Sequence, residues 1–214
     1  MKAVIAENKV AAVIIECVQG EGGVIALDAD YVKALRKLTE ENDILLAVDE
    51  VQTGNGRTGA LYAYMNYGIM PDLVSTAKGI GGGLPLGACL MSEKVEGVLG
   101  FGDHGSTFGG NPVCCAGAVS VISRIDDELL AGVRRKSEYI FAELKDAEGV
   151  ESVSGMGLMI GIKTAKPAGE VLKACMEKGV LCLTAKDKVR LLPALNIPDD
   201  LLAEAIAVIK DACR

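Results

Sequence analysis

Two short segments of the chain hold the residue types that could do covalent chemistry. Lys78 lies in DLVSTAKGIGGGLPLG, and Asp49 lies upstream of it in VDEVQTGNGRTG. A lysine amine forms a Schiff base with an aldehyde when it is positioned and partly desolvated, and the small residues around Lys78 would let a bulky ligand approach the backbone. An acidic residue at another strand end could keep a pyridinium nitrogen protonated, so that the ring stays an electron sink. The pair therefore predicts a site for an aldehyde cofactor of the pyridoxal phosphate type.

Short apolar runs that alternate with a helical stretch must position these two side chains. The pattern predicts strands at residues 11–15, 44–48 and 73–75, and a helix at 31–42. Such continuous apolar runs are typical of a parallel sheet that is covered on both faces. Polar residues follow each run, namely Glu16, Gln19 and Glu21 after the first, Asp49 and Gln52 after the second, and Lys78 after the third. Because the carboxyl ends of parallel strands meet at one edge of the sheet, we expect a ligand site there.

The character of the chain changes near residue 126. Before it, a fourth strand is predicted at 88–91 and a long helix begins at Asn111 and Pro112. After it, the pattern predicts charged helices at 128–146, 168–178 and 199–212 around short strands at 158–162, 180–183 and 188–192. We therefore expect residues 1–125 to be the remainder of a large cofactor-binding domain and residues 126–214 to form a small α+β domain.

The composition limits the classes of partner. The 22 basic and 29 acidic residues give a net charge of −7 without any basic cluster, so we expect neither nucleic acid nor an anionic membrane as partner. No apolar run reaches the length of a membrane span, and the N-terminus does not resemble a signal peptide, so we expect a soluble cytoplasmic protein. The 7 cysteines without a CxxC pair and the single histidine predict reduced core thiols and no metal site.

Six motifs occur in a fixed order along the chain: IIECVQGEGGV, VDEVQTGNGRTG, PDLVSTAKGIGGGLPLGA, HGSTFGGNP, GMGLMIGI and VRLLPALNI. Together they resemble the class III aminotransferases of pyridoxal phosphate fold type I, over essentially the whole chain. The resemblance implies an α/β fold with a truncated, mostly parallel-sheet large domain and a small α+β C-terminal domain. It also implies transfer of an amino group to 2-oxoglutarate through a Lys78 aldimine of pyridoxal 5'-phosphate, with N-acetylornithine as the donor in arginine biosynthesis. Ornithine, 4-aminobutyrate and succinylornithine are the alternative donors.

The resemblance implies a role for each residue of the cofactor site. Lys78 would be the Schiff-base lysine and Asp49 the partner of the pyridinium nitrogen, whereas a solvated loop lysine and a turn or cap aspartate are the alternatives. Val51 would pack on the cofactor ring, although it could equally be ordinary core, and Gln52 would donate to the phenolic oxygen of the ring. In the family the threonine of GSTFGG, here Thr107, reaches the phosphate of the neighbouring subunit, which implies a homodimer with a shared active site.

Three charged residues are implied to bind the amino-acid and 2-oxo-acid substrates. Glu16 and Glu21 would ordinarily be exposed loop carboxylates, but the glycines of ECVQGEGG bring the backbone close to the strand edge. The resemblance implies that Glu21 pairs with Arg190, because a free guanidinium binds the carboxylate of glutamate bidentately and a neutralised one tolerates a basic donor. A simple salt bridge is the alternative. His104 is expected to orient the GSTFGG loop rather than to transfer protons.

The chain departs from the family pattern in a few residues and in its extent. Cys17 and Ala194 stand where the family usually has proline, and Ser154 stands where an arginine commonly precedes GxGLMIG. By resemblance the chain is the C-terminal half or so of an aminotransferase, without the phosphate cup, the stacking aromatic ring and the arginine for the second carboxylate of glutamate. We therefore expect the isolated chain to be inactive, or to be a non-catalytic fragment that needs an N-terminal complement. A nucleotide-binding module is disfavoured, because GIGGG does not extend to GxGxxG.

Overall fold

The computed structural model describes residues 1–214, which form two compact units. The first unit contains residues Met1–Cys17, Leu27–Asn55 and Tyr62–Ile125, and the second contains Val18–Ala26, Gly56–Leu61 and Asp126–Arg214. The division into domains at 125/126 stays a prediction for the protein.

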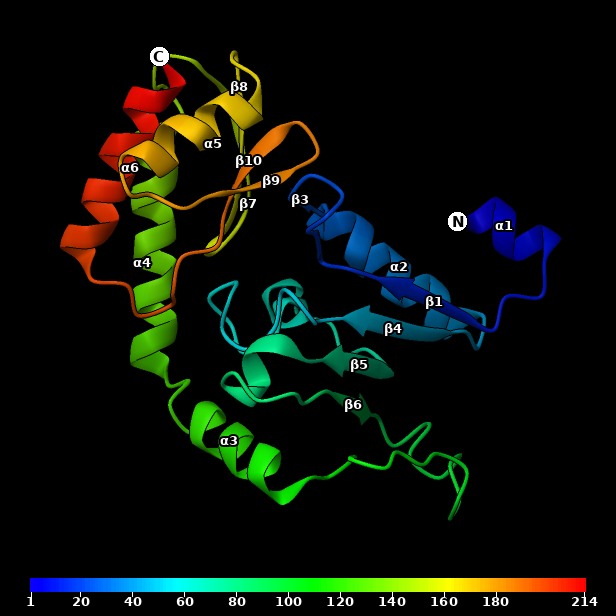
Figure 1. Ribbon diagram of the computed structural model, residues 1–214. Coiled ribbons are helices and arrows are strands. Elements are labelled where there is room, and N and C mark those ends of the chain that lie inside the picture. The colour runs from blue at the N-terminus through cyan, green and yellow to red at the C-terminus, as the bar shows by residue number, and fades with distance from the viewer. The chain divides into compact units, whose positions relative to one another are not determined.

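A four-stranded mixed sheet forms the centre of the first unit. Its strands lie in the order β1 (Ala12–Ile15), β4 (Leu45–Asp49), β5 (Leu73–Thr76) and β6 (Ala88–Met91) (Figure 1). The first three strands run parallel, and β6 is antiparallel to β5. All four lie where the apolar runs predict strands. The expectation of a sheet covered on both faces fails at the edge, since every residue of β6 is exposed.

Helix α2 packs against this sheet because its apolar positions recur at helical spacing. It spans Ala29–Glu41 and buries Val32, Leu35 and Thr39 on one face. The helix begins where the carboxylate of Asp28 accepts a hydrogen bond from the backbone N–H of Tyr31 at 2.9 Å. The remaining helical segments of the unit are α1 (Lys2–Glu7), α3 (Pro112–Ile122), and the short 3₁₀ segments η1 (Ala63–Tyr67) and η2 (Lys78–Gly81).

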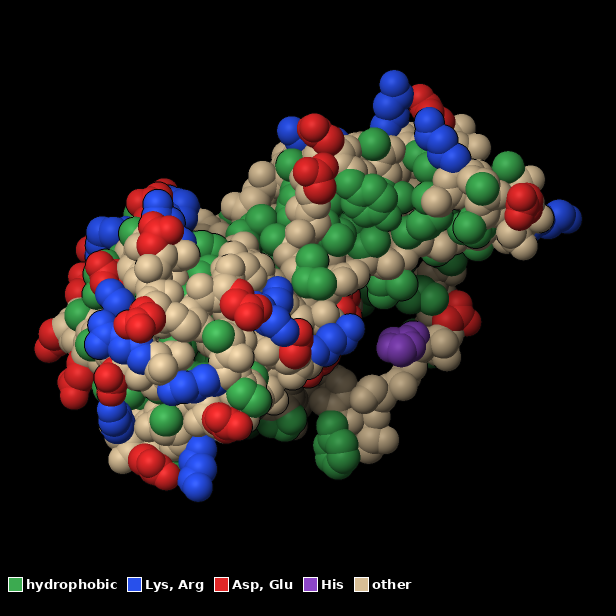
Figure 2. Space-filling view, turned by 90° about the horizontal axis from the view of Figure 1, so that it is seen from above, with side chains coloured by type: hydrophobic (Ala, Val, Ile, Leu, Met, Phe, Trp, Pro, Cys, Tyr) green, Lys and Arg blue, Asp and Glu red, His purple; other side chains and the backbone are tan.

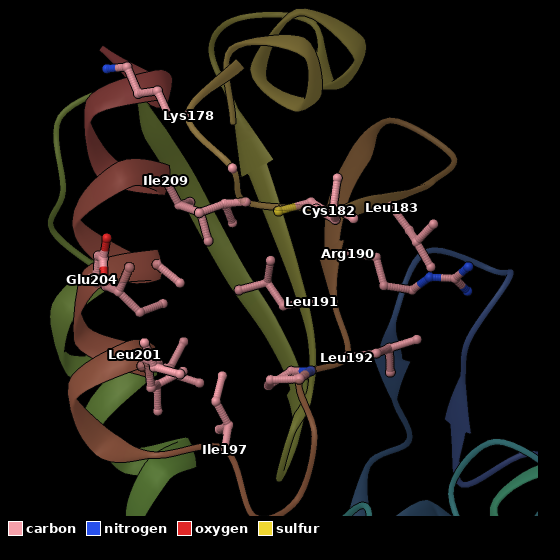
Figure 3. A pocket seen from close by; sticks show the side chains of 18 residues that line it. Lys178, Cys182, Leu183, Arg190, Leu191, Leu192, Ile197, Leu201, Glu204 and Ile209 are labelled. Atoms are coloured by element: carbon pink, nitrogen blue, oxygen red, sulfur yellow. The ribbon is translucent and has the colours of Figure 1, made fainter. Parts of the chain in front are cut away.

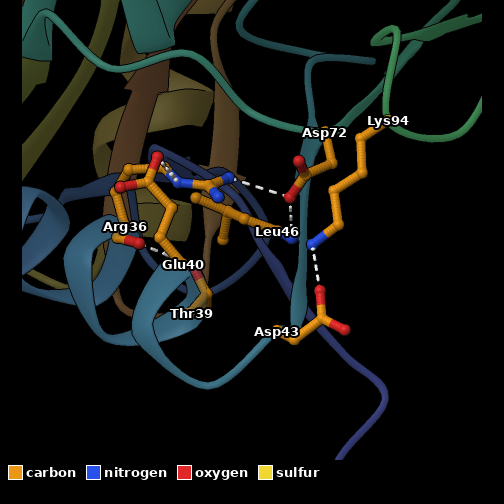
Figure 4. Close-up of polar contacts among 7 residues, drawn as sticks. All are labelled: Arg36, Thr39, Glu40, Asp43, Leu46, Asp72 and Lys94. Carbon is orange, nitrogen blue, oxygen red and sulfur yellow. Dashed lines mark hydrogen bonds and ion pairs between the residues drawn. The ribbon is translucent and has the colours of Figure 1, made fainter.

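A buried carboxylate fixes the register between β4 and β5. Oδ2 of Asp72, just before β5, accepts hydrogen bonds from the backbone N–H of Leu46 and from Nη1 of Arg36, each at 2.8 Å (Figure 4). Burial alone raises the pKa of Asp72, but these donors and the nearby Lys94 outweigh it, so the net pKa is lowered. An exposed ion pair of 2.7 Å between Lys94 and Asp43 lies beside this contact (Figure 4). The arrangement sets how far β4 and β5 extend relative to each other.

The second unit is built on an antiparallel sheet with helices packed on it. The strands lie in the order β7 (Val150–Met156), β8 (Met159–Thr164), β10 (Lys188–Leu191) and β9 (Leu183–Ala185), and β2 (Val18–Gln19) and β3 (Ile25–Ala26) form a separate pair. The helices are α4 (Asp127–Leu144), α5 (Ala168–Glu177) and α6 (Asp199–Cys213), which cover one face of the four-stranded sheet (Figure 1).

The core of the second unit lies between this sheet and the helices. Helix α4 contributes Val133, Ile140 and Leu144, which are fully buried, and each such aliphatic side chain contributes about 1.5–3 kcal/mol of stability on burial. Strand β8 is central and buried along nearly its whole length. Helix α4 is capped at its N-terminus by Asp126, whose carboxylate accepts a hydrogen bond from the backbone N–H of Leu129 at 2.8 Å.

For the second unit, one predicted strand is misplaced and one strand was not predicted. The strand expected at 180–183 begins only at Leu183, because β9 pairs with β10 through a hairpin whose register joins Ala185 to Lys188. The pattern also missed β7, which carries few apolar residues and is held by its pairing with β8. No helix of the structure is both long and apolar enough to cross a membrane.

Candidate active site

The carboxyl ends of three parallel strands bring the predicted chemical residues of the first unit to one edge. Ile15 of β1 lies in register with Val48 of β4, so Glu16 follows at the level of Asp49. Asp49 in turn lies in register with Ser75 of β5, three residues before Lys78. The strand β4, which lies between β1 and β5, thus carries Asp49. The turn that contains Lys78 follows the neighbouring strand β5.

Asp49 and Glu50 turn to opposite sides because successive residues of an extended strand alternate in direction. Asp49 is half-buried, and its Oδ1 accepts a hydrogen bond from the backbone N–H of Val51 at 2.9 Å. This local bond orients the carboxylate and leaves Oδ2 to accept from another donor. Asp49 is therefore a preoriented acceptor at the strand edge.

Glu50 is a buried carboxylate that sequence reasoning assigned no role. Its side chain is fully buried and accepts hydrogen bonds from the Thr53 hydroxyl at 2.5 Å and from the Tyr64 N–H at 2.9 Å. Burial raises the pKa of Glu50, the hydrogen bonds from Thr53, Ala63 and Tyr64 oppose this rise, and the charge of Asp49 adds to it. Glu50 ties the end of β4 to the start of η1, so it holds the turn that follows Asp49.

Lys78 lies in a backbone conformation that lysine rarely adopts. Its φ of +48° places it in the left-handed region, which costs a residue other than glycine about 1–3 kcal/mol. The side chain is exposed, and Ala77 and Gly79 beside it are small. Such strain persists only where surrounding contacts enforce it. The turn therefore presents the amine at the edge of the sheet at a conformational cost.

The side chain of Asn55 holds the backbone just before Lys78. Its Nδ2 donates to the backbone oxygen of Ala77 at 3.2 Å and to the hydroxyl of Thr76 at 3.3 Å. Asn55 is buried and itself has a φ of +57°, which asparagine tolerates better than most residues. Sequence reasoning missed this residue, and the Asn-Gly dipeptide was the only signal for its turn.

The remaining predicted cofactor residues lie in two different settings. Val51 and Gln52 are half-buried in the turn directly after Asp49. Thr107 is exposed, in the segment between β6 and α3. His104 belongs to the same exposed segment, and the single histidine is visible at the surface in purple (Figure 2). Only Val51 and Gln52 are therefore neighbours of the strand edge.

The predicted pair of Glu21 and Arg190 is formed within the second unit. Nη1 of Arg190 lies 2.6 Å from Oε1 of Glu21. The two side chains differ in exposure: that of Arg190 is 9% exposed and that of Glu21 is 74% exposed. The guanidinium is thus a buried cation whose counterion is an exposed side chain in the turn between β2 and β3. A carboxylate so placed could be displaced by another carboxylate.

Ser154, which stands at the position where the family commonly has arginine, is contacted by a lysine. Nζ of Lys188 donates to the hydroxyl of Ser154 at 2.7 Å, and this hydroxyl donates to the backbone oxygen of Val24 at 2.8 Å. The cation that the sequence lacks at position 154 is therefore supplied by Lys188 of β10, which belongs to the same sheet.

An apolar cavity of about 500 Å³ lies elsewhere in the second unit, between β9, β10 and α6. Leu191, Ile197 and Ile209 are among the side chains that line it (Figure 3). Arg190 also borders the cavity, but its guanidinium points away from these apolar side chains (Figure 3). The lining of the cavity is mostly apolar, and Lys178, Arg190 and Glu204 are its charged members.

All 7 cysteines of the chain are free thiols. Burial raises the pKa of Cys17 to about 12, of Cys182 to about 12 and of Cys213 to about 11. A thiol becomes a nucleophile only as the thiolate, so these residues are unreactive at neutral pH. No group of three or more His, Cys, Asp or Glu residues is arranged to hold a metal ion.

Comparison with known proteins finds that the chain is similar to aminotransferases. The family described as Aminotransferase class-III matches residues 1–213. The chain is 47% identical over 207 residues to acetylornithine aminotransferase of Haemophilus ducreyi, covering 96% of this chain and 53% of that protein. It is 42% identical over 210 residues to succinylornithine transaminase of Yersinia pseudotuberculosis, covering 94% and 51%. The chain therefore spans about half the length of the curated relatives it matches.

Solved structures agree with this result and confirm the predicted α/β fold class. The chain is similar to N-acetylornithine aminotransferase from Stenotrophomonas maltophilia K279a, with a TM-score of 0.87 and 35% identity over 99% of this chain and 58% of that one. It is also similar to a transaminase from the marine bacterium Virgibacillus, with a TM-score of 0.92 and 29% identity over 99% and 55%. From the family match and these likenesses in sequence and fold, the chain belongs to the class-III aminotransferase family.

Proposed function

We propose that the chain carries the lysine and carboxylate part of a pyridoxal phosphate-dependent aminotransferase site, which moves an amino group from N-acetylornithine to 2-oxoglutarate in arginine biosynthesis. The observation that carries this proposal is the pairing of Asp49 with Ser75 across β4 and β5, which puts a preoriented carboxylate beside the strained turn of Lys78. The donor is taken from the relatives named above. Ornithine, 4-aminobutyrate and succinylornithine are the alternative donors.

The residues at this edge fit pyridoxal 5'-phosphate in the chemistry of their donors and acceptors. The free Oδ2 of Asp49 suits a protonated pyridine nitrogen, and the exposed amine of Lys78 suits an aldehyde. The small neighbours Ala77 and Gly79 leave the amine accessible to a planar ring. When bound, the cofactor supplies an electron sink for the carbon that loses its proton.

The chain's own residues then have separate tasks. Lys78 holds the cofactor and, once released, its Nζ accepts and returns the proton that moves on the amino donor. Asp49 keeps the ring nitrogen protonated. Val51 packs against the ring, and Gln52 donates to its phenolic oxygen. Thr107 contributes to the phosphate site of a neighbouring subunit, so the working form is a homodimer.

The Glu21 and Arg190 pair supports recognition of two substrates by one pocket. With Glu21 displaced, the guanidinium of Arg190 binds the carboxylate of glutamate or 2-oxoglutarate with two hydrogen bonds. With Glu21 in place, the guanidinium is neutralised and does not repel a basic donor. Glu16, which lies at the level of Asp49 in the first unit, is also assigned to substrate binding.

The extent of the chain favours a second candidate, a part that works only with an N-terminal complement. The chain covers 53% of one relative and 51% of another, although 94–96% of it aligns with them. On this account the chain alone binds the cofactor weakly and transaminates negligibly. Each missing charge-assisted hydrogen bond to a phosphate is worth about 1.5–3 kcal/mol.

Glutamate formation from N-acetylornithine and 2-oxoglutarate tests the proposal. The chain is assayed with pyridoxal 5'-phosphate, alone and mixed with the N-terminal segment of a relative, and Lys78→Arg serves as the matched control. We expect glutamate only from the mixture that contains the unchanged lysine. Equal glutamate formation by Lys78→Arg would contradict the catalytic proposal, and full activity of the chain alone would reject the need for a complement.

A further inference from the structure

The turn that carries Glu21 contains a strained valine. Val24 has a φ of +53°, in the left-handed region, where a β-branched side chain is a genuine outlier. The residue is fully buried, and it closes the turn because the N–H groups of Gly23 and Val24 both donate to the backbone oxygen of Gly20. Glu21 lies inside this turn, so the conformation of Val24 decides where the carboxylate of Glu21 is placed.

Two contacts enforce the conformation of Val24. Its side chain packs against Val18, Met159 and Ala185 in a small apolar cluster. It also lies over Gly161 of β8, where an added Cβ would come within 2.8 Å of the Cβ of Val24, so the close approach requires glycine there. The side chain of Val24 is thus held against the sheet on one side.

The backbone oxygen of Val24 is held from the other side by a serine. The hydroxyl of Ser154 donates to it at 2.8 Å, and Nζ of Lys188 donates to the same hydroxyl at 2.7 Å. Because Lys188 donates to the oxygen of this hydroxyl, its single proton is left for an acceptor, and the oxygen of Val24 at 2.8 Å is closer than that of Gly161 at 3.5 Å. The side chain of Glu21 is 74% exposed and is carried by this turn, and its Oε1 lies 2.6 Å from Nη1 of Arg190. The backbone of the turn therefore sets where the carboxylate of Glu21 meets Arg190.

We propose that Ser154, supported by Lys188, is a positioning residue that holds the strained turn at Val24 and thereby keeps Glu21 on Arg190. The inference rests on the proposed function in one respect, which is the role of Arg190 in binding a carboxylate. Loosening the turn frees the guanidinium for the carboxylate of an incoming acid. Ser154 therefore sets how readily the pocket exchanges its internal carboxylate for that of glutamate or 2-oxoglutarate.

Modification of arginines by phenylglyoxal tests this inference on the 214-residue chain without cofactor or substrate. The reagent attacks accessible guanidinium groups, and peptide mass mapping gives the rate at each arginine. Ser154→Ala is expected to raise the rate at Arg190 by about 2- to 12-fold, the change that corresponds to the loss of one hydrogen bond. Ser154→Thr, which keeps the hydroxyl, should restore the slow rate, and Lys188→Met should raise the rate in the same direction.

Two controls separate positioning from a general loss of structure. Ser152→Ala makes the same change at an exposed serine of β7 and should leave Arg190 unaffected. Arg134, whose guanidinium donates to the backbone oxygen of Gly59 in the same unit, should keep its rate in every variant. A parallel rise at Arg134, or an unchanged rate at Arg190 in Ser154→Ala, overturns the inference.

A further variant, Glu21→Gln, distinguishes this inference from the proposed function. Glu21→Gln removes the counterion of Arg190 and should give the fastest modification at that residue. If Glu21→Gln reacts at the wild-type rate, the turn holds no ion pair and the positioning role is rejected. The assignment of Lys78 and Asp49 is unaffected by either result, because the assay involves no cofactor.

Discussion

At the scale of single residues, Arg190 carries the clearest prediction about substrate choice. The side chain of Arg190 is 9% exposed, and that of its partner Glu21 is 74% exposed. In the protein mixed with its N-terminal complement, Arg190→Ala should weaken the half-reaction with glutamate by about 2–5 kcal/mol, because a buried charge contact to the substrate is lost. The half-reaction with N-acetylornithine should lose much less.

Single-turnover rates of the two half-reactions check this prediction. Arg190→Lys is the matched variant, since it keeps the charge but loses the fork that binds a carboxylate with two hydrogen bonds. It should fall between the wild type and Arg190→Ala with glutamate. Equal losses in both half-reactions would indicate a plain structural salt bridge.

Asn55 carries a prediction about the lysine turn. Asn55→Ala removes both hydrogen bonds to Thr76 and Ala77 and places alanine at a positive φ. Asn55→Gly removes the same hydrogen bonds but tolerates the backbone conformation. Amide hydrogen exchange in residues 76–81 should accelerate about 2- to 12-fold in Asn55→Gly, as expected for one lost hydrogen bond, and more in Asn55→Ala. Unchanged exchange in both variants would show that the side chain does not hold the turn.

At the scale of the elements, Asp72 links the stability of the sheet to pH. Its pKa is lowered in the folded chain, so its contribution is present above the unfolded pKa of about 3.9 and is lost as the pH falls through the folded value. Asp72→Ala should lower the free energy of unfolding at pH 7 by about 3–5 kcal/mol, because the buried Arg36 keeps only the exposed Glu40 as a counterion and the N–H of Leu46 loses its acceptor. Denaturant unfolding at several pH values measures the effect.

Asp43→Asn is the control for this prediction. It removes the exposed partner of Lys94 and should cost less than about 1 kcal/mol, while asparagine still tolerates the φ of +52° at that position. The difference between wild type and Asp72→Ala should shrink as the medium becomes acidic. A difference that grows toward low pH would have the wrong sign for this carboxylate.

The elements also show what the sequence could and could not predict. The strands β1, β4 and β6 were recognisable because each consists mainly of consecutive apolar residues, and β5 was recognisable from Leu73 and Val74. The polar residues after these strands located Asp49 and Lys78. The position of β9 could not be predicted from the sequence, because a hairpin turn through Lys186 and Asp187 sets its register with β10.

Features of single residues that depend on contacts with distant parts of the chain could not be predicted from the sequence either. Asn55 contacts residues 21 and 22 positions away, and nothing in the local sequence indicates them. The Asp-Glu pair at the end of β4 does not reveal which carboxylate turns inward, since this depends on the packing of η1 against Glu50. The strain at Val24 comes from contacts with β7 and β8, which are over 120 residues away in the chain.

At the scale of the whole molecule, uncovered apolar surface predicts self-association. Ile14 on the edge strand β1 is 69% exposed, and Figure 2 shows further hydrophobic side chains at the surface. An open strand edge with exposed apolar residues pairs readily with another chain. Sedimentation analysis should therefore show association that increases with concentration, and Ile14→Lys should reduce it.

Met70→Lys is the matched control, because Met70 is also 69% exposed but lies outside the strands. It should reduce association less than Ile14→Lys does. A chain that stays monomeric at every concentration would contradict the prediction, and so would an equal effect of the two substitutions.

The most direct test of the central claim is where pyridoxal 5'-phosphate attaches to the chain. The chain is incubated with the cofactor, the adduct is reduced with borohydride, and peptide mapping gives the share on each lysine. We predict that Lys78 takes a larger share than any other lysine, even though binding by the chain alone is weak, and that Asp49→Asn lowers this share. An adduct spread over the surface lysines without preference for Lys78, or a preference that Asp49→Asn leaves unchanged, would contradict the account.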